Sequence, residues 1–486
     1  MKTAIIGAGI AGIASAVRMA CQGHQVEVFE ANSYPGGKLS SFDVEGFRFD
    51  AGPSLFTMPM YIEELFELAQ VEIDDFFKYQ KLEVACNYFW EDGTRLTAFS
   101  DPEKFAQSLE KVLGVPPERL RKALKDSERK YNLTGTIFLE NSLHKARTWL
   151  RPKVAKAMLQ TPSLDIFKTM NAVNEQQLKH PKLVQLFNRF ATYNGSNPYK
   201  ASGILNIIPH FEHGFGTFFP KGGMHSITQS LYQLAEEKGV KFNFNTKVEE
   251  IICKNGIATG IRQQGKTETY DYVISNMDIF YTYKHLLPKE KHPEKTLAQE
   301  KSSSALIFYW GVDRKFPELD LHNILFSDDY RHEFDCLAKG EISDDPTVYI
   351  HVSSKYHAAD APANAENWFT MINVPFNAGQ DWDQLIERAK TKIVEKINRI
   401  LGIKLSTLIR CEAVLDPRSI EKRTSSHLGA LYGTSSNDRM AAFLRHPNFS
   451  NQIKNLYFCG GSVHPGGGIP LCLLSAKIVS ELIAAN

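Results

Sequence analysis

Three glycines near the N-terminus have the spacing of a phosphate-binding turn. Gly7, Gly9 and Gly12 follow the apolar residues 3–6 and precede a stretch of helical periodicity that runs through residue 19. In such a turn the first glycine permits the tight bend, the second lets the backbone approach a pyrophosphate, and the third lets helix and strand pack closely. The start of the helix offers free N–H groups to the anion. The predicted phosphate contacts are Gly7, Gly9, Ile10, Ala11 and Gly12.

An acidic residue follows at the offset expected for binding a ribose. Residues 25–29 alternate like a second strand, which ends at Glu30. A carboxylate about 20 residues after the glycines accepts hydrogen bonds from ribose hydroxyls in dinucleotide-binding βαβ units. Because strand, turn, helix, second strand and acid occur in this order, we predict a dinucleotide site. This unit alone does not choose between FAD and NAD.

The two segments after Glu30 favour FAD. Residues 31–39 read ANSYPGGKL, and residues 46–54 read GFRFDAGPS. Paired glycines just after the ribose acid, followed by an FDxGP turn, resemble the flavoprotein family that includes amine oxidases and carotenoid desaturases. The resemblance implies that the first segment packs along the FAD diphosphate and ribityl chain, and that the second runs close to the isoalloxazine. The residues that it assigns to FAD are Ala31, Gly36, Gly37, Lys38, Gly52, Pro53 and Ser54.

Lys38 departs from the family pattern, in which arginine usually follows the paired glycines. The positive charge is kept, but the planar guanidinium that binds phosphate through two parallel hydrogen bonds is lost. We expect the Lys38 ammonium still to neutralise phosphate, so the departure leaves the cofactor unchanged.

A second motif lies near the C-terminus. Residues 455–477 read NLYFCGGSVHPGGGIPLCLLSAK, and the HPGGGIP turn resembles the signature of bacterial-type phytoene desaturases, with Val463 and Gly467 as mild departures. Its glycines would let the backbone approach a flat ring. The helix opened by Pro470 would direct its positive dipole at the flavin and stabilise the reduced state. The predicted contacts here are Gly460, Gly461, Gly468 and Ile469.

The middle of the chain supplies the rest of the predicted fold. The resemblance implies that Val248 contacts the adenine through its backbone and that the strand ending at Asn276 returns the chain to the FAD. We therefore predict an α/β protein. A Rossmann-type FAD-binding domain, similar to those of glutathione reductase and amine oxidases, would carry an inserted α+β substrate domain and a helical, membrane-facing portion. The FAD-binding domain would comprise 1–70, 216–290 and 425–486, and the substrate-binding domain 71–215 and 291–424.

Composition and charge narrow the class further. The chain has 486 residues, more than one hydrophobic core usually holds. Its 56 basic and 55 acidic residues give a net charge of +1, which argues against a nucleic-acid partner. Seven cysteines without CxxC spacing favour a reducing compartment over a disulfide framework or a zinc site, and the histidines lack metal-ligand spacing.

The apolar N-terminal run is too short to span a bilayer, and we interpret it as the first βα unit rather than as a signal peptide.

Three features favour a long apolar substrate. Aromatic residues make up 11% of the chain, and the apolar stretches 55–58 and 204–209 could line a tunnel, although each is by itself more typical of a core. Residues 142–156 place five cations beside Trp149 and Leu150, which fits either an anionic membrane surface or a solvated helix face. No sequence feature predicts an amine, peptide or sugar site.

Residues 30–38 and 210–220 most resemble the carotenoid 3,4-desaturase branch of the family. That branch acts on 1-hydroxylated acyclic ends or on the acyclic end of γ-carotene-type carotenoids. The resemblance implies hydride transfer to the flavin, loss of a proton, and reoxidation by oxygen or a quinone, because no second dinucleotide motif is present. Glu212 and His213 are candidate proton acceptors because they precede the return of the chain to the flavin, but a structural histidine is the stronger interpretation. A strong base is not required, since the polyene delocalises the developing positive charge.

Other functions stay open at this point. A phytoene desaturase or a redox-neutral carotenoid isomerase would share the motifs. A non-catalytic lipid- or prenyl-binding escort protein of the same fold is a different class, and the intact Gly7, Gly9, Gly12 and Glu30 argue against it. We expect a cytoplasmic enzyme that associates peripherally with the inner face of the cell membrane, where its carotenoid substrate is dissolved.

Overall fold

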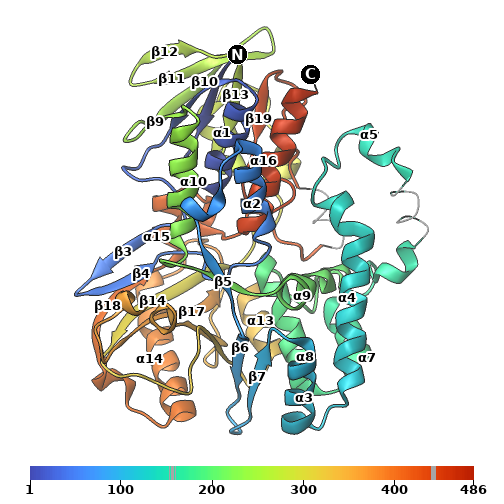
Figure 1. Cartoon of the computed structure of the whole chain (residues 1–486), viewed down its shortest axis with the longest axis vertical. Helices are drawn as coiled ribbons and strands as arrows, with labels where there is room; N and C mark the ends of the chain where they lie inside the picture. The colour runs from blue at the N-terminus through green and yellow to red at the C-terminus, as the bar shows by residue number, and fades with distance from the viewer. Residues whose placement is uncertain (153, 155–157, 159, 439–444, 486) are drawn as a thin grey trace.

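A five-stranded parallel sheet forms the centre of the nucleotide-binding lobe, with the strand order β19–β13–β1–β2–β9 (Figure 1). The computed structural model describes residues 1–152, 154, 158, 160–438 and 445–485. Strands from distant parts of the sequence lie side by side in this sheet: Lys2–Ile6 (β1), Gln25–Phe29 (β2), Lys241–Asn243 (β9), Tyr272–Ser275 (β13) and Leu456–Phe458 (β19). All five strands start from the same edge, so their carboxyl ends meet at the opposite edge.

The alternation of side chains along β1 explains how both faces of this sheet are covered. Ile5 belongs to the core shared with four packed helices: Ile10–Cys21 (α1), Met60–Ala69 (α2), His225–Glu237 (α10) and Ile469–Ala484 (α16). Ala4 and Ile6 point to the other face, where an antiparallel sheet packs through Val248 and Ile261. That sheet contains Val248–Lys254 (β10), Ile257–Gln263 (β11) and Lys266–Thr269 (β12).

A seven-stranded mixed sheet forms the second lobe, with the order β18–β14–β17–β16–β15–β6–β7. Its strands are Val84–Phe89 (β6), Arg95–Phe99 (β7), Ser304–Val312 (β14), His322–Leu325 (β15), Val348–His351 (β16), Glu366–Val374 (β17) and Ile409–Leu415 (β18). The long helix Trp382–Leu401 (α14) covers one face. Asp381 caps the start of α14 by accepting from the Gln384 N–H, and Gly402 ends the helix with a φ of 66°.

A hairpin joins the two lobes. Ser41–Val44 (β3) and Phe47–Asp50 (β4) lie in the predicted FAD-binding range, yet Phe47 and Phe49 pack into the core of the seven-stranded sheet. A second connection is made where Tyr79–Lys81 (β5) pairs with Phe218–Pro220 (β8). The predicted units therefore share buried contacts, and their exact boundaries stay a prediction.

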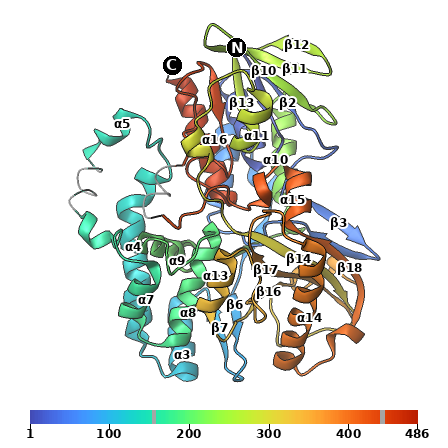
Figure 2. The ribbon, with the colours of Figure 1, turned by 180° about the vertical axis from the view of Figure 1, so that it is seen from behind.

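Helices fill the space beside the seven-stranded sheet, as seen from both sides in Figures 1 and 2. They are Pro102–Leu113 (α3), Pro117–Phe138 (α4), Met170–Leu178 (α7), Pro181–Asn188 (α8), Ile208–His210 (α9) and Tyr330–Ala338 (α13), whereas Ala146–Trp149 (α5) lies farther away, at the level of α16. Short helices elsewhere are Ile279–Tyr281 (α11), Glu294–Leu297 (α12) and Pro417–Thr424 (α15). The predicted mixed α/β class is confirmed. None of the helices in the described part of the chain is long and apolar enough to cross a membrane.

Candidate flavin and substrate site

One continuous cavity of about 1290 Å³ extends from the parallel sheet into the inserted parts of the chain. Gly9 and Glu30 line its nucleotide-binding end, whereas Leu205, Phe211 and Ile324 line the part within the inserted segments. Most ligand pockets have volumes of about 300–1000 Å³. The cavity is therefore large enough for a dinucleotide and a further elongated ligand.

The glycine turn after β1 is shaped by close backbone contacts. Gly7 has a φ of 95°, which favours glycine. A Cβ on Gly9 would lie 2.7 Å from Asn276 Oδ1, and a Cβ on Gly12 would lie 2.1 Å from the Gly7 carbonyl oxygen. All three glycines are thus required by the path of the backbone, as the sequence predicts.

Two helices begin at the cavity without a side-chain cap, unlike helices such as α3. The start of α3 is capped by Asp101, which accepts from the Glu103 and Lys104 N–H groups. By contrast, α1 begins after Gly9 and α16 begins after Gly468, and among the described residues neither start has a side-chain cap or an acidic residue in its first turn. Asn276 Oδ1 accepts from the Gly12 N–H of α1, and the earlier N–H groups and the positive dipole ends are left for an anionic or electron-rich ligand.

Glu30 lies at the end of β2, where the sequence predicts a ribose acid. The side chain is buried, with Oε2 accepting from the Ala8 N–H at 2.8 Å and Oε1 accepting from the Asn32 N–H at 2.9 Å. These bonds fix the carboxylate in one orientation. Oε1 also accepts from Asn32 Nδ2 at 2.9 Å, so it is Oε2, with one donor among the described residues, that keeps acceptor capacity for a ribose hydroxyl.

The paired glycines lie against the first turn. The Gly36 N–H donates to the Ala8 carbonyl at 2.7 Å, and a Cβ on Gly37 would be only 3.5 Å from Gly9 Cα. Ala31 and Asn32 line the same part of the cavity. The predicted diphosphate segment is therefore beside the predicted phosphate turn.

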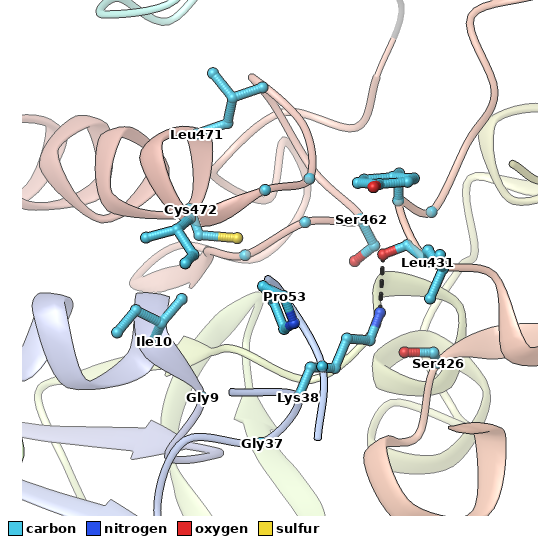
Figure 3. Close-up of a pocket in the computed structure, with 18 of the residues that line it drawn as sticks. Gly9, Ile10, Gly37, Lys38, Pro53, Ser426, Leu431, Ser462, Leu471 and Cys472 are labelled. Carbon is cyan, nitrogen blue, oxygen red and sulfur yellow. Dashed lines mark hydrogen bonds between the residues drawn. The ribbon is translucent and has the colours of Figure 1, made fainter. Parts of the chain in front are cut away.

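Lys38 extends away from the glycine turn, as Figure 3 shows. Its Nζ donates to the Leu431 carbonyl at 2.9 Å, and burial lowers its pKa while the nearby Asp278 opposes that shift. A Cβ on Gly52 would lie 2.0 Å from the Lys38 carbonyl oxygen, so the two segments are tightly packed. The ammonium has carbonyl partners in this structure, and its contact with phosphate stays a prediction.

The HPGGGIP turn closes the cavity opposite α1. In Figure 3, Gly9 and Ile10 lie on one side of the pocket, and Leu471 and Cys472 of α16 lie on the other. A Cβ on Gly467 would come within 2.9 Å of Tyr432 Cα, so this turn packs directly against the backbone at Tyr432. Gly460, Gly461, Gly468 and Ile469, all predicted from sequence, line the cavity.

Arg445 supports the turn from behind and lines the cavity. The buried guanidinium donates to the carbonyls of Tyr432 at 2.8 Å and Thr434 at 2.7 Å. It also reaches the Gly461 carbonyl at 3.3 Å and Asn194 Oδ1 at 3.1 Å. These acceptors are uncharged, and burial lowers the pKa of Arg445 to about 10. Its positive charge therefore stands beside the glycine turn without a carboxylate among these partners.

Val248 and Asn276, which the resemblance assigns to FAD, both line the cavity. Val248 is the first residue of β10. Asn276 has a clear structural task, since its Oδ1 accepts from the Gly12 N–H at 3.1 Å and its Nδ2 donates to the Cys459 carbonyl at 3.2 Å. It ties α1 to the end of β19.

The part of the cavity in the inserted segments is mainly apolar. Four residues of the stretch 204–209 contribute to it, namely Ile204, Leu205, Ile207 and Ile208. From the stretch 55–58, Leu55 and Thr57 line the cavity, whereas Phe56 and Met58 are core residues. We call this apolar part of the cavity the chamber. Its lining residues are Leu55, Thr57, Ile204, Leu205, Ile207, Ile208, Phe211, Ile324 and Phe369.

The two candidate proton acceptors differ in position. Glu212 lines the cavity, but His213 is absent from its described lining. The His213 ring stacks on Phe105 at 5.2 Å, and burial lowers its pKa. Neither ring nitrogen of His213 has a hydrogen-bond partner among the described residues. This geometry favours a core role for His213.

Comparison with known proteins identifies the family. The model of the flavin-containing amine oxidoreductases matches residues 10–484. The chain belongs to this family. Solved structures of low sequence identity show the same fold. Putrescine oxidase bound to putrescine has a TM-score of 0.66 at 13% identity, and an oxidoreductase from Methanosarcina mazei has a TM-score of 0.64 at 16% identity. Each comparison covers at least 99% of both chains.

Curated relatives of this flavin-containing amine oxidoreductase cover its whole length. A 1-hydroxycarotenoid 3,4-desaturase from a Flavobacterium species is 52% identical over 99% of both chains. A 4,4'-diapophytoene desaturase from Staphylococcus haemolyticus is 31% identical over 99% of this chain and 98% of that protein. A 4,4'-diapolycopene oxygenase from a Methylomonas species is 32% identical over 100% of this chain and 98% of that protein. The resemblance predicted from the sequence motifs is confirmed.

This flavoprotein is an oxidoreductase with FAD as its cofactor, and its own residues fit that group. The uncapped starts of α1 and α16 would face the diphosphate and the ring system, and Glu30 would bind the ribose. Close contacts at Gly9 and Gly467 leave no room for larger side chains beside the cavity. Among the described residues, no cluster of histidine, cysteine and acidic side chains could hold a metal ion.

Sequence reasoning missed the cavity residues that come from unrelated segments. These are Arg189, Tyr193, His322, Tyr349, Tyr432 and Arg445. None of them belongs to a spaced motif, because each is a single polar side chain in an otherwise apolar or irregular stretch. Only the three-dimensional fold brings them to one cavity.

Proposed function

We propose that this flavoprotein is a carotenoid desaturase that introduces the 3,4 double bond at an acyclic, 1-hydroxylated end of its substrate. The observation that carries the proposal is the single cavity in which the FAD-binding surface continues into an apolar chamber. The relative that is 52% identical over 99% of both chains supports the substrate class and the bond.

The chain contributes orientation and exclusion of water. FAD supplies the acceptor for the hydride that leaves the substrate. The chamber would hold the polyene so that the reacting bond comes within about 3–3.5 Å of the cofactor, and its apolar lining would keep water away. Because the polyene stabilises its own developing positive charge, orientation matters more than a strong protein base. Oxygen or a quinone is the proposed oxidant of the reduced cofactor.

We also propose that the protein attaches peripherally to the inner face of the cell membrane. Among the residues of 149–167 that the structure describes, four large apolar side chains are exposed: Trp149 (43%), Leu150 (83%), Met158 (61%) and Phe167 (69%). Basic side chains accompany them, among them Arg147, Arg151 and Lys168, whereas the predicted cations Lys153 and Lys156 lie outside the described residues. Exposed apolar side chains beside cations suit an anionic lipid surface.

The position of this exposed segment supports a route for the substrate. Leu139 and Leu143 line the cavity and directly precede the exposed residues. A carotenoid dissolved in the bilayer would thus reach the chamber without crossing bulk water.

Expression in hosts that accumulate different carotenoids tests the activity. We expect a host containing 1-hydroxylated acyclic ends to form a product that has lost two hydrogens. A product of unchanged mass would make the protein an isomerase, and a product with added oxygen would make it an oxygenase, as in the Methylomonas relative. Unchanged pigments in the lycopene, γ-carotene and 1-hydroxylated backgrounds would contradict the proposal.

A further inference from the structure

A polar cluster interrupts the apolar wall of the chamber. Arg189, Tyr193 and Glu212 line the cavity, and the buried Tyr88 lies behind them. Arg189 donates through Nη1 to the Tyr193 hydroxyl at 2.6 Å and through Nη2 to the Tyr88 hydroxyl at 2.7 Å. The Tyr193 hydroxyl in turn donates to Glu212 Oε2 at 2.6 Å. The four side chains form one connected network.

This network leaves one carboxylate oxygen weakly satisfied. Glu212 Oε1 has Arg189 Nη2 at 3.4 Å and His213 Nε2 at 3.5 Å, and Arg189 Nη2 already makes a shorter bond to Tyr88. Both Arg189 and Glu212 are at least nine-tenths buried. A buried carboxylate oxygen at a cavity wall therefore keeps the capacity to accept a short hydrogen bond from a ligand.

Burying the charges of Arg189 and Glu212 costs free energy, and binding a pure hydrocarbon would not require either charge. Removing two charges from water costs several kcal/mol per ion, and apolar side chains of similar volume are often as stable or more stable. Aromatic rings surround the Arg189 guanidinium, with centroids 4.5 Å away at Phe190 and 5.0 Å away at Tyr193. Polar groups held at this cost in an apolar chamber suit a ligand that has a polar group of its own.

The cluster also lies towards the flavin end of the chamber. The Tyr349 hydroxyl donates to Ser54 Oγ at 2.9 Å, and Ser54 belongs to the segment that the family places along the isoalloxazine. In the seven-stranded sheet, Ile324 pairs with Tyr349 on one side and with Tyr88, the partner of Arg189, on the other. Tyr349 thus connects the flavin segment to the neighbourhood of the cluster.

We propose that Arg189, Tyr193 and Glu212 bind the tertiary hydroxyl at C1 of the carotenoid end and so select hydroxylated ends over hydrocarbon ends. The inference rests on the proposed function. The hydroxyl would donate to Glu212 Oε1, and its oxygen would accept from the Arg189 guanidinium. Since this oxygen is only three bonds from C3, anchoring it also fixes which bond of the chain meets the flavin. The cluster therefore acts as a specificity-determining and positioning site.

Paired substrates that differ only in the C1 hydroxyl test this assignment. In Glu212→Gln with FAD bound, we expect kcat/KM for the hydroxylated carotenoid to fall about 10- to 100-fold, which corresponds to about 1.5–3 kcal/mol for a hydrogen bond to a charged group. For the hydrocarbon-ended partner we expect a change of less than about threefold, because it makes no such bond. Tyr193→Phe loses the donor to Glu212 and the acceptor for Arg189 but keeps both charged groups, so it should show a smaller loss in the same direction.

Glu333→Gln is the matched control. Glu333 is buried and accepts from Ser327 Oγ at 2.9 Å and Thr347 Oγ1 at 2.7 Å, and it is not among the described residues that line the cavity. It therefore carries the same chemical change and a similar cost in stability, and it should leave the preference for the hydroxylated substrate intact. Equal losses for both substrates in Glu212→Gln would overturn the proposal.

A binding measurement separates this inference from the proposed function. Quenching of protein fluorescence by the two carotenoids reports their affinities without turnover. If the wild type converts neither carotenoid, the proposed function is wrong. The hydroxyl site is then still supported by tighter binding of the hydroxylated carotenoid that Glu212→Gln abolishes, and it is overturned by equal affinities in the wild type.

Discussion

At the residue scale, the most unusual charge at the flavin cavity is Arg445. Its guanidinium is buried, its acceptors among the described residues are three carbonyls and one amide oxygen, and its pKa is lowered to about 10. A cation without a carboxylate partner favours negative charge nearby more strongly than a paired one. Reduction of the flavin adds negative charge, so Arg445 should favour the reduced state together with the dipole of α16.

Replacing Arg445 tests this electrostatic role. We expect Arg445→Gln to make the midpoint potential of bound FAD more negative, by about 30 mV for each ~1.4 kcal/mol of lost stabilisation. A spectroscopic redox titration measures the shift, and Arg445→Lys, which keeps the charge, should retain most of the wild-type potential. An unchanged potential in Arg445→Gln with FAD bound would show that the residue only supports the turn.

Residues differ in how far the sequence could predict their place. Gly9 and Glu30 could be assigned because their function depends on a strand, a turn and a helix that follow one another directly in the sequence. Glu212 was found, although as a proton acceptor rather than as part of a network with Arg189 and Tyr193. Both partners lie in the short helix Arg189–Asn194, whereas Glu212 lies in Phe211–Phe215, and nothing in the spacing of the two segments indicates that the fold brings them to one wall.

At the element scale, the proposed function rests on two helix starts and on the exposed segment. Helices α1 and α16 could be predicted from glycine and proline positions, and the structure adds that both starts face one cavity. The apolar stretches 55–58 and 204–209 could not be divided into core and cavity residues from sequence. Apolar side chains are shielded from water both in the core and in the cavity wall, so the hydrophobicity of a residue does not tell which of the two it joins.

The exposed apolar segment yields a prediction about membranes. We expect Leu150→Glu combined with Phe167→Glu to weaken binding to vesicles containing anionic lipid by at least about tenfold, since each side chain contributes about 1.5–3 kcal/mol when fully buried. Vesicle co-sedimentation measures this binding. Leu68→Glu is the control, because Leu68 is also exposed but lies in α2, outside the segment. Equal binding by the double variant and the wild type would refute the proposed attachment site.

At the scale of the whole molecule, buried histidines couple stability to pH. Burial lowers the pKa of His351, His446 and His464 to about 4. In the unfolded chain their pKa is about 6.5, so the unfolded state binds more protons between these values. The free energy of unfolding should therefore be highest above about pH 6.5 and decrease as the pH falls towards 4.

Thermal unfolding measured between pH 4 and pH 8 checks this dependence. We expect Tm to be nearly constant above about pH 7 and to fall steadily below about pH 6.5. His351→Gln should flatten the profile because one of the titrating groups is gone. A Tm in the wild type that stays constant down to pH 4.5 would contradict the linkage.

The whole molecule is organised around one cavity that two lobes build together. The parallel sheet and its helices offer the surface for FAD, and the inserted sheet and helices supply the chamber (Figures 1 and 2). Under the proposed function, this joint cavity would let a chain with a net charge of +1 and no spanning helix among its described residues act on a membrane-dissolved polyene.

The most direct measurement incubates the purified, FAD-loaded protein with a 1-hydroxylated acyclic carotenoid and a quinone in lipid vesicles, and determines the product by mass and NMR. The account predicts a product with two hydrogens fewer and a new double bond between C3 and C4. Bleaching of the flavin absorbance on anaerobic mixing without the quinone should accompany it. A flavin that stays oxidised while the carotenoid is recovered unchanged would contradict the central claim.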